Sequence, residues 1–170
     1  LWQTGAKRGY VATDSANIRW DKNFTPWKFK DPAEEMGGVN EITVNFWESQ
    51  SSYQVVWSYD PGTSSYKRRN GEDHIDLNNR EQLAAKVIIV QFQRESNAND
   101  GYPGNVHLLY QTSGSGRALI FQDGGAVEGK WIKPSRMARS KYVDSKGVEV
   151  ELNRGQIWIQ TVPEGSKVSY

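Results

Sequence analysis

Two neighbouring segments, Glu41-Ile-Thr-Val-Asn-Phe-Trp47 and Tyr53-Gln-Val-Val-Trp-Ser-Tyr59, decide the fold of this chain. In both segments every second side chain is apolar: Ile42, Val44 and Phe46 in the first, then Tyr53, Val55, Trp57 and Tyr59 in the second. This alternation places the apolar side chains on one face of an extended chain, which is typical of half-buried β-strands. The segments therefore predict two strands that cover a core with one face.

Turn signals divide the rest of the chain into more short strands. Asp60-Pro61-Gly62 and Asn70-Gly71 predict turns, and Val87–Phe92 is a mostly β-branched run typical of a strand buried on both faces. Further turns are expected at Ser113–Gly116, Asp123–Gly125, Asp144–Gly147 and Asn153–Gly155, with strands at 118–122, 127–132, 148–152 and 157–162 between them. Strands at this spacing predict an antiparallel meander.

Short helices are expected beside these strands. Asn79, with Gln82 three residues later, has the form of a capping box, which predicts a helix that continues to Lys86. A second short helix is expected over Leu1–Arg8, ended by Gly9. We therefore predict an α+β fold, a predominantly antiparallel β meander with one or two short helices. Residues 1–40 are expected to form an irregular, aromatic-rich segment, and residues 41–170 a β-rich C-terminal domain.

The composition excludes several classes of function. Lys and Arg number 21 and Asp and Glu 20, so the net charge of +1 does not favour a nucleic-acid partner. The chain has no cysteine, which excludes disulfides, thiolate metal sites and cysteine nucleophiles. Its two histidines, His74 and His107, lack the spacing of a zinc site. We expect no cofactor, no metal and no catalytic residue in this chain.

One glycine-rich segment resembles a nucleotide-binding loop. Gly124-Gly-Ala-Val-Glu-Gly-Lys130 has the spacing G-x-x-x-x-G-K, but Trp131 follows where the magnesium-binding Ser or Thr is required. These glycines are also expected in a hairpin turn, whereas a phosphate-binding loop joins a strand to a helix. The segment is therefore not expected to bind nucleotides.

The hairpin around Asn70-Gly71 holds one group of candidate ligand contacts, Arg68, His74 and Asp76. With a two-residue turn, the expected cross-strand neighbours are Arg69 with Glu72, Arg68 with Asp73, and Lys67 with His74. The first two are opposite-charge pairs, and they account for most of the local charge without any catalytic role. We therefore rank this group second.

The first-ranked candidate site lies between Gly129 and Val143, where five basic residues occur with no acidic residue among them: Lys130, Lys133, Arg136, Arg139 and Lys141. Aromatic residues, among them Trp131, interleave with these charges, a pattern suited to phosphate or carboxylate groups. The alternative is a solvated strand edge whose lysines discourage edge-to-edge pairing. The candidate ligand contacts here are Trp131, Lys133, Arg136 and Arg139.

The order of strands and turns resembles that of a known family. The matching segments are Trp57–Asp60, Tyr66–Arg68, His74–Asp76, Glu81–Leu83, Lys86–Gln91, Ser113–Gly116, Ala118–Phe121, Gly129–Trp131 and Gly155–Ile159. From about Asn40 to the C-terminus they resemble the YerB-like family of bacterial cell-envelope lipoproteins, whose role is unassigned, and residues 1–40 match more loosely. The resemblance implies an extracytoplasmic protein held at the membrane by a lipid anchor that is absent from this chain. It also implies that the chain is the C-terminal portion of a longer protein.

Two hypotheses of function follow. The first is a non-enzymatic module that binds a partner protein or an anionic cell-envelope polymer. The alternative is an enzyme that acts on cell-wall material, with a catalytic site completed by a missing N-terminal region. A deep pocket with two carboxylates would favour the enzyme, whereas a basic and aromatic surface would favour the binding module.

Overall fold

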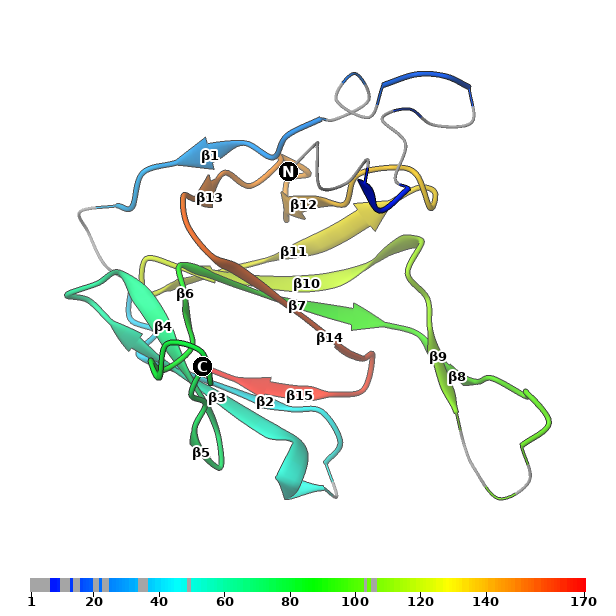
Figure 1. The fold of residues 1–170 in the computed structure, drawn as a ribbon. Coiled ribbons are helices and arrows are strands. Elements are labelled where there is room, and N and C mark those ends of the chain that lie inside the picture. Colours follow the sequence, from blue (N-terminus) through cyan, green and yellow to red (C-terminus); the bar gives the residue numbers. More distant parts are fainter. Residues whose placement is uncertain are drawn as a thin grey trace.

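Two β-sheets that share a core form most of the molecule (Figure 1). The computed structural model describes residues 7–9, 13, 16–19, 22, 25–33, 37–48, 50–102, 104 and 107–170. The five-stranded sheet has the order β12 (Lys141–Asp144), β11 (Gly125–Lys133), β10 (Gly114–Gln122), β7 (Val87–Gln93) and β14 (Ile157–Pro163). The six-stranded sheet has the order β15 (Lys167–Ser169), β2 (Glu41–Asn45), β3 (Gln54–Asp60), β4 (Ser65–Asn70) and β5 (Glu72–Asp73), with β6 (Ala84–Ala85) also paired to β4.

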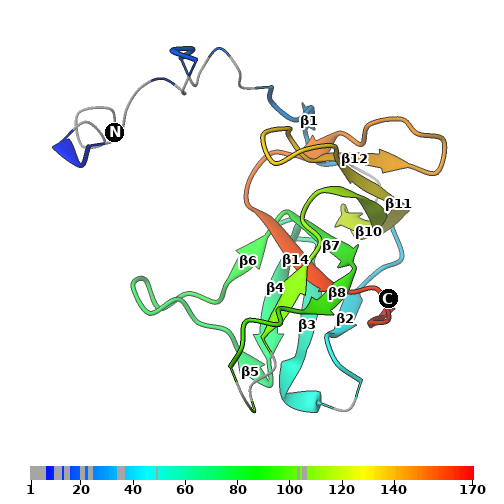
Figure 2. The same cartoon turned by 90° about the vertical axis from the view of Figure 1, so that its right-hand side faces the viewer.

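Two small sheets complete the fold. β1 (Phe29–Lys30) pairs in parallel with β13 (Leu152–Asn153), and β8 (Glu95–Asn97) forms a hairpin with β9 (Leu108–Tyr110). Seen from the side, this hairpin projects next to β14 and the six-stranded sheet (Figure 2). None of the described residues belongs to a helix long and apolar enough to cross a membrane.

The prediction of an α+β fold is wrong, because the described residues are nearly all β. Helical geometry among them is limited to a 3₁₀ turn, η2 (Ser51–Tyr53), and to the single described residues Lys7 and Lys22. The expected helix from Asn79 to Lys86 is absent because Asn79 Oδ1 accepts a hydrogen bond from Glu81 N at 3.0 Å, which closes a tight turn. This local bond competes with helix formation, and the chain continues into β6 instead. The helix expected at residues 1–8 lies, apart from Lys7 and Arg8, outside the described residues.

The strand predictions are correct in outline. β2, β3, β7 and β14 lie where expected, and Asp123 and Gly124 form the predicted turn with φ angles of 56° and 65°. Two expectations fail: Ser113–Gly116 leads into β10 instead of turning, and only the end of 148–152 is a strand. The architecture is also not a simple meander, because β14 returns to pair in parallel with β7.

β7 lies between two hydrophobic clusters, and all seven of its residues are buried. One face contributes Ile88, Val90 and Phe92 to the core shared with the six-stranded sheet. The other face contributes Val87 and Ile89 to a second cluster, which also contains Trp131 and Tyr142. The expectation of a strand covered on both faces is therefore confirmed.

Trp131 packs across β10 through a position that only glycine fits. Its indole Nε1 donates a hydrogen bond to Phe92 O at 2.8 Å. Gly116 is the cross-strand partner of Trp131, and a Cβ at position 116 would lie 2.5 Å from that Nε1 and 2.6 Å from Phe92 O. Both contacts are far shorter than van der Waals separation, so Gly116 permits the close approach of indole and backbone.

We expect Gly116→Ala to lower the free energy of unfolding by about 1–3 kcal/mol, the usual cost of overpacking a filled core. Urea unfolding followed by tryptophan fluorescence measures this change. Gly165→Ala is the matched control, because a Cβ at Gly165 meets no atom within 4 Å. Equal stability of the two variants would contradict the packing assigned to Trp131.

A buried ionic cluster joins the small β1–β13 sheet to the β10–β11 turn. Asp123 accepts hydrogen bonds from Lys30 Nζ at 2.6 Å, from Asn153 Nδ2 at 2.6 Å and from Ala33 N at 3.2 Å. Burial alone would raise the pKa of Asp123, but the bonds from Lys30 and Asn153 outweigh it and hold the pKa below its ordinary value. The ionised carboxylate therefore stabilises the fold above the ordinary pKa, and this stabilisation is lost as the pH falls through the lowered one.

We expect Asp123→Asn to lower the free energy of unfolding at neutral pH by about 1–3 kcal/mol, because it removes hydrogen bonds to a charged group. Asn retains the turn because it tolerates the positive φ. The difference from the native protein should narrow as the pH falls below about 4, the ordinary pKa, and disappear once the pH passes the lowered pKa at which the native carboxylate is protonated. Urea unfolding across the acid range measures the gap, and a gap independent of pH would contradict the assignment. Asp31→Asn, which removes an exposed ion pair with Arg154, is the control with little expected effect.

Candidate functional site

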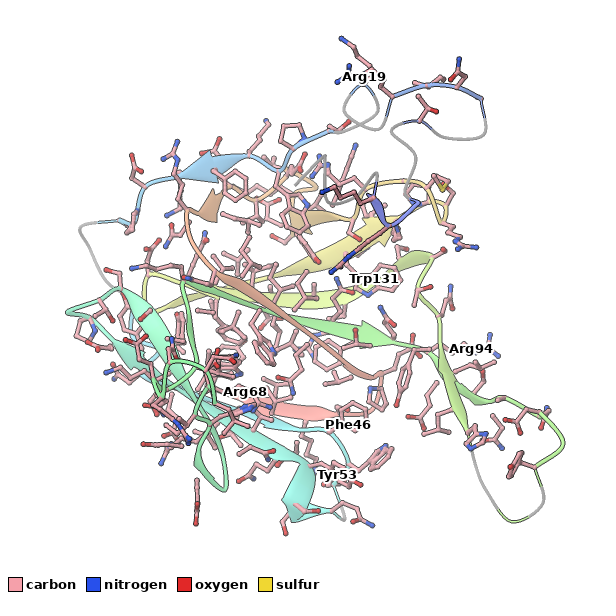
Figure 3. All side chains as sticks on the ribbon, in the orientation of Figure 1. Arg19, Phe46, Tyr53, Arg68, Arg94 and Trp131 are labelled. Atoms are coloured by element: carbon pink, nitrogen blue, oxygen red, sulfur yellow. The ribbon has the colours of Figure 1, made fainter. Side chains whose placement is uncertain are left out.

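A cleft of about 780 Å³ opens where four parts of the chain meet. Its walls come from the segment after β2 (Phe46, Trp47, Tyr53), from β3 and β4 (Val55, Arg68, Asn70), from the β8–β9 hairpin (His107, Leu108, Tyr110) and from β14 (Trp158, Ile159, Gln160, Thr161). Figure 3 shows Phe46, Tyr53 and Arg68 together over the six-stranded sheet. Aromatic and aliphatic walls with a few polar groups are typical of ligand-binding clefts.

Arg68 is the charged residue in the wall of this cleft, and its guanidinium lies against two indole rings that also contact each other. The guanidinium carbon lies 5.8 Å from the ring centroid of Trp57 and 5.0 Å from that of Trp158. Arg68 is only 8% exposed. The electron-rich faces of the two rings offset part of the cost of removing this cation from water.

The described residues offer Arg68 no negative partner. The one hydrogen bond of its side chain to a described residue joins Nη1 to His74 Nδ1, and its buried Nε has no acceptor among them. No carboxylate of the described residues forms an ion pair with it. Burial lowers the pKa of Arg68, yet a guanidinium stays protonated at neutral pH. The cleft therefore contains a positive charge with unused hydrogen-bond donors, an arrangement that favours an anionic ligand.

The alternation along β4 puts Arg68 in this position, because Arg68 follows Tyr66 by two residues and shares its buried face. In the β4–β5 hairpin, Asn70 faces Glu72 and Arg69 faces Asp73, so the strands are shifted by one residue from the predicted pairing. The predicted pair of Arg68 with Asp73 is therefore wrong.

Neighbouring basic residues of β4 do have carboxylate partners. Arg69 Nη2 lies 2.9 Å from Glu41 Oε2, and Lys67 Nζ lies 2.8 Å from Asp60 Oδ2. These pairs hold the solvent side of the strand, and the hydrogen bond from Lys67 lowers the pKa of the Asp60 carboxyl. Arg68 thus differs from both of its sequence neighbours in having its charge uncompensated.

Similar proteins identify the family but not an activity. Residues 42–159 match the model described as "Protein of unknown function (DUF3048) C-terminal domain". The chain belongs to this family. The crystal structure of YerB protein from Bacillus subtilis is similar to it, with a TM-score of 0.72 and 19% identity over 99% of this chain and 52% of that one. The chain thus spans about half the length of the YerB chain and shares its fold, which confirms the predicted resemblance. Among curated proteins, none matches the chain significantly.

Of the hairpin residues predicted for the DUF3048 domain, the structure brings Arg68 and His74 together. The exposed His74 accepts the hydrogen bond from Arg68 if its Nδ1 is unprotonated. Asp76 plays a different part: its Oδ1 accepts a hydrogen bond from Asn78 N at 2.8 Å within a turn. Asp76 does not line the cleft.

The basic segment of the DUF3048 domain does not form the expected aromatic and basic surface. Trp131 is 2% exposed and belongs to the core, on the sheet away from Arg68 (Figure 3). Lys133 Nζ donates to the carbonyl oxygens of Arg136 and Ala138, and Arg139 Nη1 lies 2.6 Å from Glu149 Oε1. The bond from Arg139 lowers the pKa of Glu149. Arg136 is exposed, but the other three predicted contacts are buried or occupied within the fold.

Acid–base chemistry finds little support among the described residues. His107, at the rim of the cleft, contacts Asp100, and the bond from His107 lowers the pKa of that carboxyl. Within the described part of the chain, no serine or threonine hydroxyl bonds to His107, and no group of acidic and histidine side chains is arranged to hold a metal ion.

Sequence reasoning missed the aromatic walls of the site, above all Trp158, because they come from segments far apart in the chain. One local signal was available for Arg68. Arg68 follows the aromatic Tyr66 by two residues in a strand, so the two side chains share one face. A prediction based on this alternation, and not on the turn type, would have placed Arg68 on the buried face.

We expect Arg68→Met to leave the free energy of unfolding within about 1 kcal/mol of the native value, or to raise it, because replacing an uncompensated buried charge with an apolar chain is often neutral or stabilising. Thermal and urea unfolding of the ligand-free domain measure the change. Arg139→Met is the matched control, expected to cost about 1–3 kcal/mol because Glu149 loses its partner. A larger loss for Arg68→Met than for Arg139→Met would show that Arg68 serves the fold.

Proposed function

We propose that this domain is a non-enzymatic module that binds an anionic group of a ligand at Arg68. The observation that carries the proposal is the buried guanidinium, which lies against the rings of Trp57 and Trp158 and has no carboxylate partner among the described residues. A protein gains no stability from burying a charge in this way. Such a group is explained by a ligand that supplies the missing negative charge.

The walls of the cleft specify the rest of the ligand. Phe46, Tyr53 and Tyr110 line it with aromatic surface, so the anionic group would be attached to an apolar body. The terminal guanidinium nitrogens of Arg68, which lines the cleft, are planar donors that suit the oxygens of a carboxylate or phosphate. The resemblance to cell-envelope lipoproteins supports a ligand outside the cytoplasm, close to the membrane at which a lipid anchor would hold the protein.

A small aromatic acid tests this proposal directly. We expect hydrocinnamate to bind and to change the fluorescence of Trp57 and Trp158, and hydrocinnamamide, which has the same shape without the charge, to bind about tenfold or more weakly. Arg68→Met should remove the preference for the acid. The control Arg139→Met should retain it, because Arg139 is paired with Glu149 away from the cleft. Equal binding of acid and amide by the native domain, or no binding of either, would overturn the proposal.

A further inference from the structure

β14 presents a free strand edge to the cleft. β7 is the only described strand that pairs with β14, and the sheet ends there. Figure 1 shows this order from β11 through β10 and β7 to β14. Four consecutive residues, Trp158 to Thr161, line the cleft. Because side chains alternate between the faces of a strand, a lining of consecutive residues means that the cleft follows the edge of β14.

The hydrogen bonds at the two ends of β14 show which backbone groups are free. Val87 N donates to Gln156 O at 3.3 Å, and Glu164 N donates to Gln93 O at 3.1 Å. In a parallel ladder, successive residues of a strand direct their backbone N–H and C=O groups alternately to the neighbour on one side and to the opposite side. The even-numbered residues of β14 therefore bond to β7, and Ile159 and Thr161 direct their N–H and C=O groups to the free edge.

This edge lacks the protection that the other sheet edges have. The other edge strands are short and charged: β12 contains Lys141 and Asp144, β5 is Glu72–Asp73, and β15 begins with Lys167. β14 is seven residues long, and its sequence, IWIQTVP, has no charged side chain; its proline is the last residue and leaves the edge from Trp158 to Thr161 open. Proteins normally guard edges with charges or short strands, because an open edge pairs with other chains. An unguarded edge beside a binding cleft is suited to a strand added by a partner.

Two polar groups beside this edge indicate what the added strand carries. Arg68 supplies a positive charge without a described carboxylate partner, and Gln160 Oε1 is a buried acceptor without a hydrogen-bond donor among the described residues. Both residues line the cleft. A carboxylate side chain would satisfy the first group, and an N–H or O–H donor next to it would satisfy the second.

We propose that the ligand of the Arg68 cleft is an extended, acidic peptide segment of a partner protein, which adds a strand to the free edge of β14 and places a Glu or Asp side chain on Arg68. This inference rests on the proposed function and specifies its ligand. Main-chain hydrogen bonds to Ile159 and Thr161 supply affinity, and the carboxylate supplies specificity. An anionic wall polymer fits the charge of Arg68 but leaves the edge unpaired.

A capped synthetic peptide as long as β14, made of alternating Val and Thr with one central Glu, tests the inference by NMR and hydrogen exchange. We expect the amides of Ile159 and Thr161 to exchange at least about tenfold more slowly when the peptide is bound, because they gain strand hydrogen bonds. The amides of Trp158 and Gln160, already bonded to β7, serve as internal controls with little change. A peptide with Gln in place of Glu should bind about tenfold more weakly.

Two further variants separate backbone pairing from charge recognition. A peptide N-methylated along one edge keeps the Glu but loses its donors, and we expect it to bind no better than hydrocinnamate. Thr161→Pro removes a donor on the free side without breaking the ladder to β7, so it should weaken the peptide about tenfold and leave hydrocinnamate binding intact. If Thr161→Pro does not fold, the N-methylated peptide still tests whether binding needs backbone hydrogen bonds.

The outcomes distinguish the two proposals. If hydrocinnamate binds through Arg68 but the peptide binds no tighter and protects neither Ile159 nor Thr161, the strand-addition inference is overturned and the anion site stands. Preferential, Arg68-dependent binding of poly(glycerol phosphate) overturns the peptide in favour of a polymer. If neither hydrocinnamate nor the peptide depends on Arg68, both proposals fall.

Discussion

The burial of β7 on both faces is the constraint on which this fold depends. Its run of β-branched and apolar residues needs cover from two sides, and the six-stranded sheet provides one while the second cluster provides the other. β7 also needs a partner on each edge, which are β10 on one side and the returning β14 on the other. The parallel pairing with β14 brings a C-terminal strand to the centre of the molecule and leaves its far edge open.

This arrangement also creates the candidate site. β14 carries Trp158 to the six-stranded sheet, where it meets Trp57 edge to face with ring centroids 5.3 Å apart. Arg68 of β4 lies against both rings. The stack thus joins the two sheets and holds a cation at their junction, while the β8–β9 hairpin closes one side of the cleft. Aromatic packing, charge and open edge meet at one place because β14, which supplies Trp158 and the open edge, lies next to Arg68 of β4.

Patterns with a short range predicted the fold well. Period-two alternation located β2 and β3, the β-branched run located β7, and Asp123-Gly124 located a turn. The capping box gave a wrong prediction because the Asn79 side chain accepts a hydrogen bond from the backbone N–H of Glu81, and the resulting tight turn takes the place of a helix. Trp131 was expected at the surface because its burial depends on Gly116 in another strand. The predicted partner of Arg68 was wrong because the β4–β5 hairpin is shifted by one residue, whereas its burial follows from the alternation that it shares with Tyr66.

The central claim is that Arg68 binds an anion within an aromatic cleft. Diffraction from crystals soaked in para-bromohydrocinnamate tests it most directly, because the bromine atom is located by its anomalous signal and the carboxylate by its density. The account predicts a carboxylate in contact with the Arg68 guanidinium and a bromine among Phe46, Tyr53 and Tyr110. Density for the acid at other sites, with Arg68 unoccupied at a saturating soak, would contradict it.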